Sequence, residues 1–480
     1  MSDLDRKLVR GSAWLALSFG GSQIVSFVIA VIVAHFVTPS AFGLVALASV
    51  AIVALSLLQE SGLGLAIIQR RTEVAAAAGT AFVFTAVAGI VLYAAAFGVA
   101  PFLANLFSEP RLTEVVRVLA LVLILRGLGF VPGALIEREL LFARRAKGEL
   151  GAVMVQATVA IPLAISGLGV WSLVAGQLAG QAVQTAIFWV VTPLRPLPRL
   201  FSFKILRELG GFARHVTAAN VIHFIEQNVD TATVGRLLGA ANVGYYNIAW
   251  RLSNLPATGI AYIVGRVMFP AYADLQHDRA AFRNAFLSNV RRVALVSLPV
   301  GVGILLAAHP IVVGLFGERW EPAVAPLQIL AVYGVTRAFT GTASPVLQAA
   351  GKPQLVAMLS LWHLAVLSVA LFALTPPYGL RGAASAVAIA GVCSLVPAFW
   401  LAVRALDLPL RELIANVERP AVCSLPLVVA LLMVGVATAG LAAGIQLLLM
   451  TICGLVVYGA SAFALARGEL RAITAAFRSP

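Results

Sequence analysis

The sequence predicts an all-α polytopic membrane protein of about fourteen transmembrane helices, and three observations lead to this class. The mean hydropathy of the 480 residues is +0.97, with 61% hydrophobic and 11% charged residues, which is more apolar surface than a soluble fold can bury. Apolar runs of about 20 residues recur along the chain, as expected of helices that cross a bilayer. The basic residues between these runs follow a strongly one-sided pattern.

The apolar runs divide into fourteen predicted spans. These cover about 11–37, 42–68, 76–100, 114–135, 149–167, 170–192, 212–234, 243–270, 290–308, 323–348, 354–375, 381–403, 420–440 and 443–466. We expect six segments: an N-terminus (1–10), an N-lobe of six spans (11–192), a basic interfacial linker (193–211), a C-lobe of six spans (212–403), two further spans (420–466) and a tail (467–480).

The distribution of lysine and arginine predicts the orientation. With the N-terminus in the cytoplasm, the cytoplasmic segments hold 25 basic residues and the opposite face holds 4. Both termini are therefore expected in the cytoplasm, and topology explains the net charge of +14 without a nucleic-acid partner. The loops on the opposite face are short, such as "TPSA" and "GAAN", and leave no room for a catalytic domain there. The three cysteines lie within spans, and no metal or cofactor site is expected.

Weak internal similarity predicts that the two lobes are repeats. A shift of 201 residues places "PSAFGLVALA" (39–48) on "AANVGYYNIA" (240–249), and a shift of 211 places Arg126 on Arg337. Because six spans per lobe is an even number, the two lobes would share one orientation in the membrane. That arrangement suits rocking of two bundles about a central cavity.

Several stretches resemble a known family. "TPSAFGLVALASV", "NVDTATVGRLLGAANVGYYNIAWRLSNLP" and "LFGERWEPAVAPLQIL" are similar to bacterial polysaccharide transporters of the colanic-acid-exporter type. These form the Wzx-like branch of the superfamily that also holds multidrug antiporters and lipid II flippases. The resemblance implies alternating access between two lobes and transport of undecaprenyl-pyrophosphate-linked oligosaccharides across the bacterial inner membrane, for exopolysaccharide or lipopolysaccharide (O-antigen) synthesis. It also implies, as partners, membrane lipids and a polymerase and chain-length regulator of the same pathway.

Charged residues in the interior of the predicted spans, away from their ends, are the candidate site residues, because each costs about 2.5–3.5 kcal/mol at the bilayer centre unless it has water or a partner. Those arginines are Arg126, Arg251, Arg266 and Arg337, and the acids are Glu60, Glu226 and Asp230. Helical spacing aligns them with neutral polar residues on four stripes, which predicts a hydrated chamber between the lobes.

The resemblance suggests what the arginines bind. A guanidinium presents a planar fork of donors that matches phosphate oxygens, so Arg126 and Arg337 are candidates to hold a lipid pyrophosphate. The other expected substrate-binding residues are Arg251, Arg266, Asn254 and Tyr333. The alternative is internal ion pairing, for example between Arg251 and Asp230.

The acids allow two interpretations. Glu226, Asp230 and Glu60, with His223 beside Glu226, are candidates for a proton or sodium site that couples transport. Alternatively they pair with arginines and orient the helices.

Two other functions compete with lipid-linked sugar transport. A cation-coupled multidrug antiporter of the same superfamily would favour an acidic, aromatic-lined cavity, whereas this sequence places four arginines against three acids in the interior of its spans, away from their ends. A membrane-embedded polymerase or transferase would need a sizeable loop or a paired catalytic constellation, and the short loops offer neither.

Overall fold

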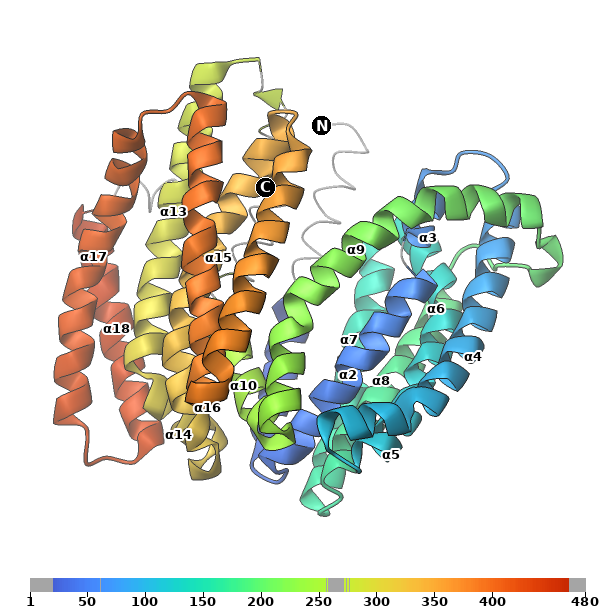
Figure 1. The fold of residues 1–480 in the computed structure, drawn as a ribbon, viewed down its shortest axis with the longest axis horizontal. Helices are drawn as coiled ribbons and strands as arrows, with labels where there is room; N and C mark the ends of the chain where they lie inside the picture. Colours follow the sequence, from blue (N-terminus) through green and yellow to red (C-terminus); the bar gives the residue numbers. More distant parts are fainter. Residues whose placement is uncertain are drawn as a thin grey trace. The chain divides into compact units, whose positions relative to one another are not determined.

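The computed structural model describes residues 20–60, 62–255, 257, 272, 274–275 and 277–465 (Figure 1). Within these residues the secondary structure is helical without strands, which confirms the all-α prediction. The chain separates into two compact units, Met1–Gly244 and Tyr245–Pro480. This division lies later in the sequence than the linker expected at 193–211, and the predicted lobe boundaries stay a prediction.

The first unit is a bundle of long helices joined by short turns. A helix over Gly20–Ala34 leads into it. The helices that follow are α2 (Pro39–Glu60), α3 (Leu63–Gln69), α4 (Val74–Phe107), α5 (Leu112–Leu119), α6 (Leu121–Arg138), α7 (Phe142–Ile165), α8 (Val170–Val191), the 3-10 turn η1 (Pro198–Leu200), α9 (Phe203–Leu238) and α10 (Ala240–Ser253), which continues into the second unit.

The second unit is also a helical bundle. Its helices are α13 (Arg279–Leu306), α14 (Ala308–Phe316), the 3-10 turn η3 (Glu318–Ala323), α15 (Val324–Ala349), α16 (Pro353–Leu406), α17 (Leu410–Ala437) and α18 (Ala443–Leu465). Asp278 caps α13, because its carboxylate accepts hydrogen bonds from the backbone N–H groups of Ala280 and Ala281. The core of this unit packs α13, α15, α16 and α17 around Phe286 and Phe339.

Ten helices in the described part of the chain are long and apolar enough to cross a membrane, so the chain is a multi-pass membrane protein. The count of fourteen stays a prediction, because much of the first and eighth predicted spans lies outside the described residues. The element α16 accounts for two predicted spans. Its 54 residues are interrupted at Gly379, which has φ 57° and ψ −135°, in the "GL" where the sequence predicts the break.

The helix α9 differs most from its sequence-based expectation. Residues 193–211 are predicted as an interfacial linker, yet α9 runs without a break from Phe203 to Leu238 and is visibly curved in Figure 1. Ile205 and Leu209, four residues apart, are buried against α3 and α4, while Lys204 stays exposed. Residues 203–211 of the expected linker are therefore the first turns of the same helix that carries the polar stripe.

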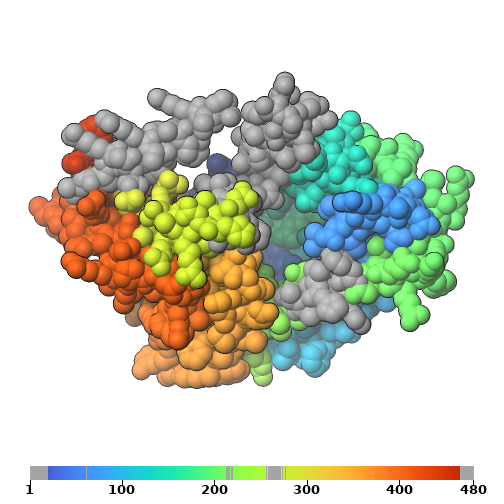
Figure 2. All heavy atoms as spheres, turned by 90° about the horizontal axis from the view of Figure 1, so that it is seen from above, coloured from blue at the N-terminus to red at the C-terminus, as the bar shows by residue number. Residues whose placement is uncertain are grey.

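Figure 2 shows one face of the molecule, coloured along the chain. In unit 1, arginines connect the ends of several helices. Arg70, between α3 and α4, donates to the carboxylates of Glu208 (2.9 Å) and Glu73 (3.0 Å). The hydrogen bond to Glu208 is the main reason that the pKa of Arg70 is raised. Arg138 at the end of α6 donates to the Ile67 carbonyl at 2.7 Å. These contacts tie α3 to both α6 and α9.

Two glycines allow the starts of α2 and α10 to cross at backbone contact. A Cβ atom added to Gly43 would lie 1.7 Å from the carbonyl oxygen of Ala240, and one added to Gly244 would lie 2.0 Å from that of Pro39. The contact is reciprocal, and the 201-residue shift pairs Gly43 with Gly244 and Pro39 with Ala240. The two segments aligned by the sequence repeat thus pack on each other through equivalent atoms.

We expect Gly43→Ala and Gly244→Ala each to lower the thermal unfolding midpoint of the detergent-purified protein. The added methyl group cannot fit without separating the two helices, and overpacking of this kind costs about 1–3 kcal/mol. The matched control is Gly98→Ala in α4, where a Cβ atom meets nothing within 4 Å. Equal midpoints for all three variants would contradict a tight crossing.

Candidate functional site

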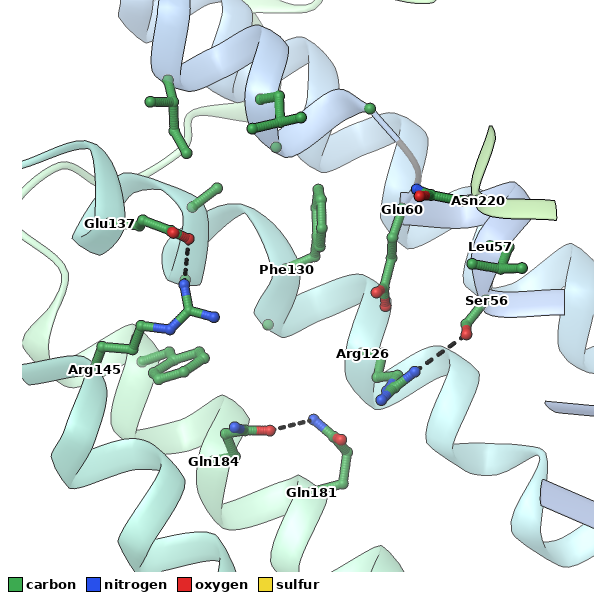
Figure 3. Close-up of a pocket in the computed structure, with 18 of the residues that line it drawn as sticks. Ser56, Leu57, Glu60, Arg126, Phe130, Glu137, Arg145, Gln181, Gln184 and Asn220 are labelled. Atoms are coloured by element: carbon green, nitrogen blue, oxygen red, sulfur yellow. Dashed lines mark hydrogen bonds and ion pairs between the residues drawn. The ribbon is translucent and has the colours of Figure 1, made fainter. Parts of the chain in front are cut away.

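The first unit contains a polar cavity of about 570 Å³, which we call the Arg126 cavity. Five helices, α2, α6, α7, α8 and α9, contribute polar side chains to its wall (Figure 3). Those side chains are Ser56, Glu60, Arg126, Glu137, Arg145, Gln181, Gln184 and Asn220. Two of the sequence-predicted residues, Arg126 and Glu60, are thus brought to one cavity.

Arg126 presents donors to this cavity. Its guanidinium donates one hydrogen bond to the hydroxyl of Ser56 at 3.1 Å. Glu60 lies one helical turn after Ser56, and its carboxylate points toward Arg126 in Figure 3, so each charge acts on the other. Among the described residues Ser56 is the hydrogen-bond partner of Arg126, and a guanidinium has five N–H donors. Several donors are therefore left for a ligand.

A buried glutamine fixes the helices that carry these groups. The side chain of Gln59 has no exposed surface, and its Nε2 donates to the carbonyls of Thr85 on α4 (2.8 Å) and Leu123 on α6 (3.1 Å). Cβ atoms at Gly89 and Gly127 would lie only 2.9 and 2.4 Å from this nitrogen. The amide therefore fills a space that two glycines leave open, and it orients Ser56 and Glu60 on either side of it.

The second arginine of the cavity has carboxylate partners. Arg145 on α7 forms an ion pair with Glu137 on α6 and donates to Glu149 at 2.9 Å, one turn along its own helix. Two acids therefore balance Arg145. Arg145 is one of the 25 basic residues expected on the cytoplasmic side, and it lies at the cavity wall.

In the second unit, Arg337 has a different surrounding. Its guanidinium donates to Oδ1 of Asn254 at 2.9 Å, and it lies 5.6 Å from the ring centroid of Trp250 and 6.0 Å from that of Tyr333. Asn254 is buried and also donates to the Trp250 carbonyl. Three predicted residues, Arg337, Asn254 and Tyr333, are thus brought together in this unit.

The acids of α9 are not equivalent. The carboxylate of Glu226 lies 3.9 Å from Nδ1 of His223, whose side chain is 67% exposed. Asp230 is buried, and its Oδ1 accepts from the backbone N–H of Thr231 at 2.7 Å. Whether these acids bind a coupling ion stays a prediction.

The contacts described above do not include Arg251 or Arg266. Arg251 is partly buried on α10, and its proposed ion pair with Asp230 would join two different units, so it stays a prediction. Arg266 lies outside the described residues. The central chamber between the lobes likewise stays a prediction.

Comparison with known families identifies the chain. The model of the family "Polysaccharide biosynthesis protein" matches residues 32–325, more than half of the chain. The chain belongs to this family. The resemblance drawn from its sequence is therefore confirmed.

Curated relatives of this family member are involved in several polysaccharide pathways. It is 23% identical to the teichuronic acid biosynthesis protein TuaB of Bacillus subtilis, over 88% of this chain and 87% of TuaB. It is 26% identical to the lipopolysaccharide biosynthesis protein WzxC of Escherichia coli, over 73% of this chain and 71% of WzxC. The succinoglycan biosynthesis transport protein ExoT of Rhizobium meliloti is 26% identical over 68% of this chain and 66% of its own length.

Solved structures show the same fold in other transporters. The lipid II flippase MurJ in an inward closed conformation aligns with a TM-score of 0.76 at 14% identity, over 95% of this chain and 99% of MurJ. An inward-facing multidrug transporter of the MATE family aligns with a TM-score of 0.65 at 18% identity, over 80% of this chain and 94% of its own. At these identities the likeness concerns the fold alone.

Sequence reasoning missed the glutamines of this family member. Gln177, Gln181 and Gln184 follow one another at helical spacing on α8, and Gln156 lies on the neighbouring α7. Interior charge does not indicate these residues, because an amide side chain is uncharged. A search for uncharged amides repeated every three or four residues within a span would have found them.

We expect Gln59→Leu to destabilise the protein, because leucine fills the space but cannot bridge α4 and α6. Losing a buried hydrogen-bonding side chain of this kind costs about 1–3 kcal/mol. The readout is the thermal unfolding midpoint in detergent.

The matched control is Gln69→Leu, the same substitution at an exposed position at the end of α3. A Gln59→Leu midpoint equal to that of the control would contradict the assigned role of Gln59.

Proposed function

We propose that this chain is a flippase that moves a polyprenyl-pyrophosphate-linked oligosaccharide from the cytoplasmic to the outer leaflet of the bacterial inner membrane. Membership of the polysaccharide biosynthesis family supports a transporter rather than an enzyme. Relatives named for transport, such as ExoT, and the fold of the lipid II flippase MurJ support the flippase assignment. The ratio of 25 basic residues to 4 supports cytoplasmic termini.

The observation that carries the proposal is Arg126. It lies in a polar cavity within a bundle of apolar helices, held by Ser56 with further donors available. A pyrophosphate is the part of the substrate that an apolar bundle excludes most strongly, and a guanidinium matches its oxygens. We propose that Arg126 holds the pyrophosphate in the first unit and that Arg337 contributes the second contact.

In this proposal the prenyl chain stays in lipid while the headgroup crosses. Glu60 stands beside Arg126, so it competes with an arriving phosphate for the guanidinium and is the acid best placed for coupling to a proton or sodium ion. Glu226 is the second candidate. A polymerase and a chain-length regulator are proposed as pathway partners on the family resemblance.

The first test is Arg126→Ala in a strain that lacks the chromosomal gene. We expect surface polymer to be lost and lipid-linked sugar to accumulate on the inner leaflet, with normal amounts of the protein in the membrane. Arg126→Lys should restore export only in part, because an ammonium group cannot make the bidentate contact.

Arg117→Lys is the control, since Arg117 lies on α5 over the ring of Phe97, away from the cavity-lining residues. Wild-type export by Arg126→Ala would contradict the proposal. Unchanged export together with drug sensitivity on deletion would instead favour the antiporter alternative.

A second test concerns Glu60. Removing its charge with Glu60→Gln keeps the shape of the side chain and removes the repulsion of a phosphate on Arg126. We therefore expect the purified variant to bind undecaprenyl pyrophosphate more tightly than the wild-type chain does. Weaker binding would mean that Glu60 supports the ligand and does not compete with it.

A further inference from the structure

A second polar cavity of about 410 Å³ adjoins the first, and it is lined by glutamines. We call it the glutamine cavity. Its polar wall consists of Gln156, Gln177, Gln181, Gln184, Arg126, Glu149 and Ser22. Four uncharged amides in one cavity of an apolar helix bundle require an explanation, because a polar group in this setting is costly without a hydrogen-bonding partner.

The cavity is built by the pattern "GQLAGQAVQ" on α8. Gly176 and Gly180 let α8 approach α7 closely: a Cβ atom at Gly176 would lie 2.8 Å from that of Ala160, and one at Gly180 would lie 2.8 Å from the carbonyl oxygen of Ala152. Each of these glycines is followed directly by a glutamine. The glycine face therefore packs, and the adjacent face turns its amides into the cavity.

The glutamines on α8 lie on one helical face, at positions 177, 181 and 184. Gln181 donates to Gln184 at 3.2 Å, which orients these two amides side by side (Figure 3). Gln156 is added from α7, beside the backbone approach of Gly180. All four glutamines are partly exposed and line the cavity.

The two cavities are adjacent, because Arg126, Gln181 and Gln184 line both. A ligand whose anionic group lies on Arg126 would therefore extend directly into the glutamine cavity. The remaining charged residue there, Glu149, already accepts a hydrogen bond from Arg145. The other polar groups there are the four neutral amides and the hydroxyl of Ser22.

Amides match the hydroxyl groups of a sugar. Each amide has two N–H donors and an acceptor oxygen, and each sugar hydroxyl both donates and accepts. An apolar prenyl chain would leave the amides unpaired, and a cationic drug would meet the positive charge of Arg126. The chemistry of the wall therefore favours a neutral, hydroxyl-rich group joined to an anion.

We propose that the glutamine cavity is the subsite for the first sugar of the lipid-linked oligosaccharide, the residue attached directly to the pyrophosphate. This inference rests on the proposed function and deepens it. Gln177 and Gln156 bind the hydroxyl groups of that sugar, and Gln181 and Gln184 lie between the sugar and pyrophosphate sites.

The test measures binding to the purified full-length chain in detergent. The probes are undecaprenyl pyrophosphate alone and undecaprenyl pyrophosphate bearing glucose, galactose or N-acetylglucosamine. The wild-type chain should bind at least one sugar-bearing lipid more tightly than the bare lipid. Gln177→Leu and Gln156→Leu should each weaken that binding roughly 3- to 10-fold, as expected for lost hydrogen bonds.

The affinity for bare undecaprenyl pyrophosphate should stay unchanged in both variants, which shows that they remain folded. Gln69→Leu at an exposed position is the matched control and should behave as wild type. Arg126→Ala should lose affinity for all four lipids.

The outcomes distinguish failure of the sugar subsite from failure of the proposed flippase function. If the wild-type chain prefers no sugar-bearing lipid, or if both glutamine variants keep its preference while Arg126→Ala loses binding, the sugar subsite is overturned and the proposed function stands. If the wild-type chain binds none of the four lipids, both are overturned. Loss of the sugar preference alone supports the subsite.

Discussion

The first unit depends on one buried amide. An apolar helix bundle gains little from the hydrophobic effect inside a membrane, so close packing and interhelical hydrogen bonds must fix the helices. Gln59 supplies such a bond twice, to α4 and to α6, from the centre of a crossing that Gly89 and Gly127 make possible. Because α2 is held at this point, Ser56 and Glu60 reach Arg126. The geometry of the cavity follows from a side chain that does not line it.

Polar residues in this unit fall into two classes with opposite requirements. Gln59 and Thr85 are buried and donate hydrogen bonds to carbonyl groups of neighbouring helices. Arg126 and Gln177 line a cavity and keep donors available. Glycines support both classes. They bring helix backbones close enough for the buried side chains to reach neighbouring carbonyl groups, and they leave the adjacent helical face to the side chains that line a cavity. Helix packing and the polar cavities therefore both depend on glycines, at different positions in the unit.

The sequence predicted those residues of the candidate site whose burial in a membrane costs the most free energy. Charge in a span is expensive, so Arg126 and Glu60 could be found by inspection, and helical spacing aligned Ser56 with Glu60. A glutamine costs less free energy in a span than a charged residue does, and the mean hydropathy of a span hides it. Gln156 and the glutamines of α8 were therefore not predicted as site residues. The continuous α9 was missed because helix propensity does not stop at a membrane surface, whereas a span predicted from hydropathy does. The break in α16 was predicted from the interruption between two apolar runs, and the structure places it at Gly379, whose positive φ suits a glycine.

The repeat adds a final physical point about Arg126 and Arg337. The 211-residue shift makes the two positions equivalent, yet their surroundings differ. Arg126 faces a carboxylate and a serine hydroxyl, whereas Arg337 is held by the amide of Asn254 and lies near two aromatic rings. A carboxylate competes with a phosphate for the same donors, while an amide oxygen and a ring orient a guanidinium without competing as strongly. Two equivalent arginines can thus have unequal affinities for one anion. An anion shifts the balance between two conformations only as far as it binds them differently, so this difference matters for transport only if the conformations present the two arginines differently.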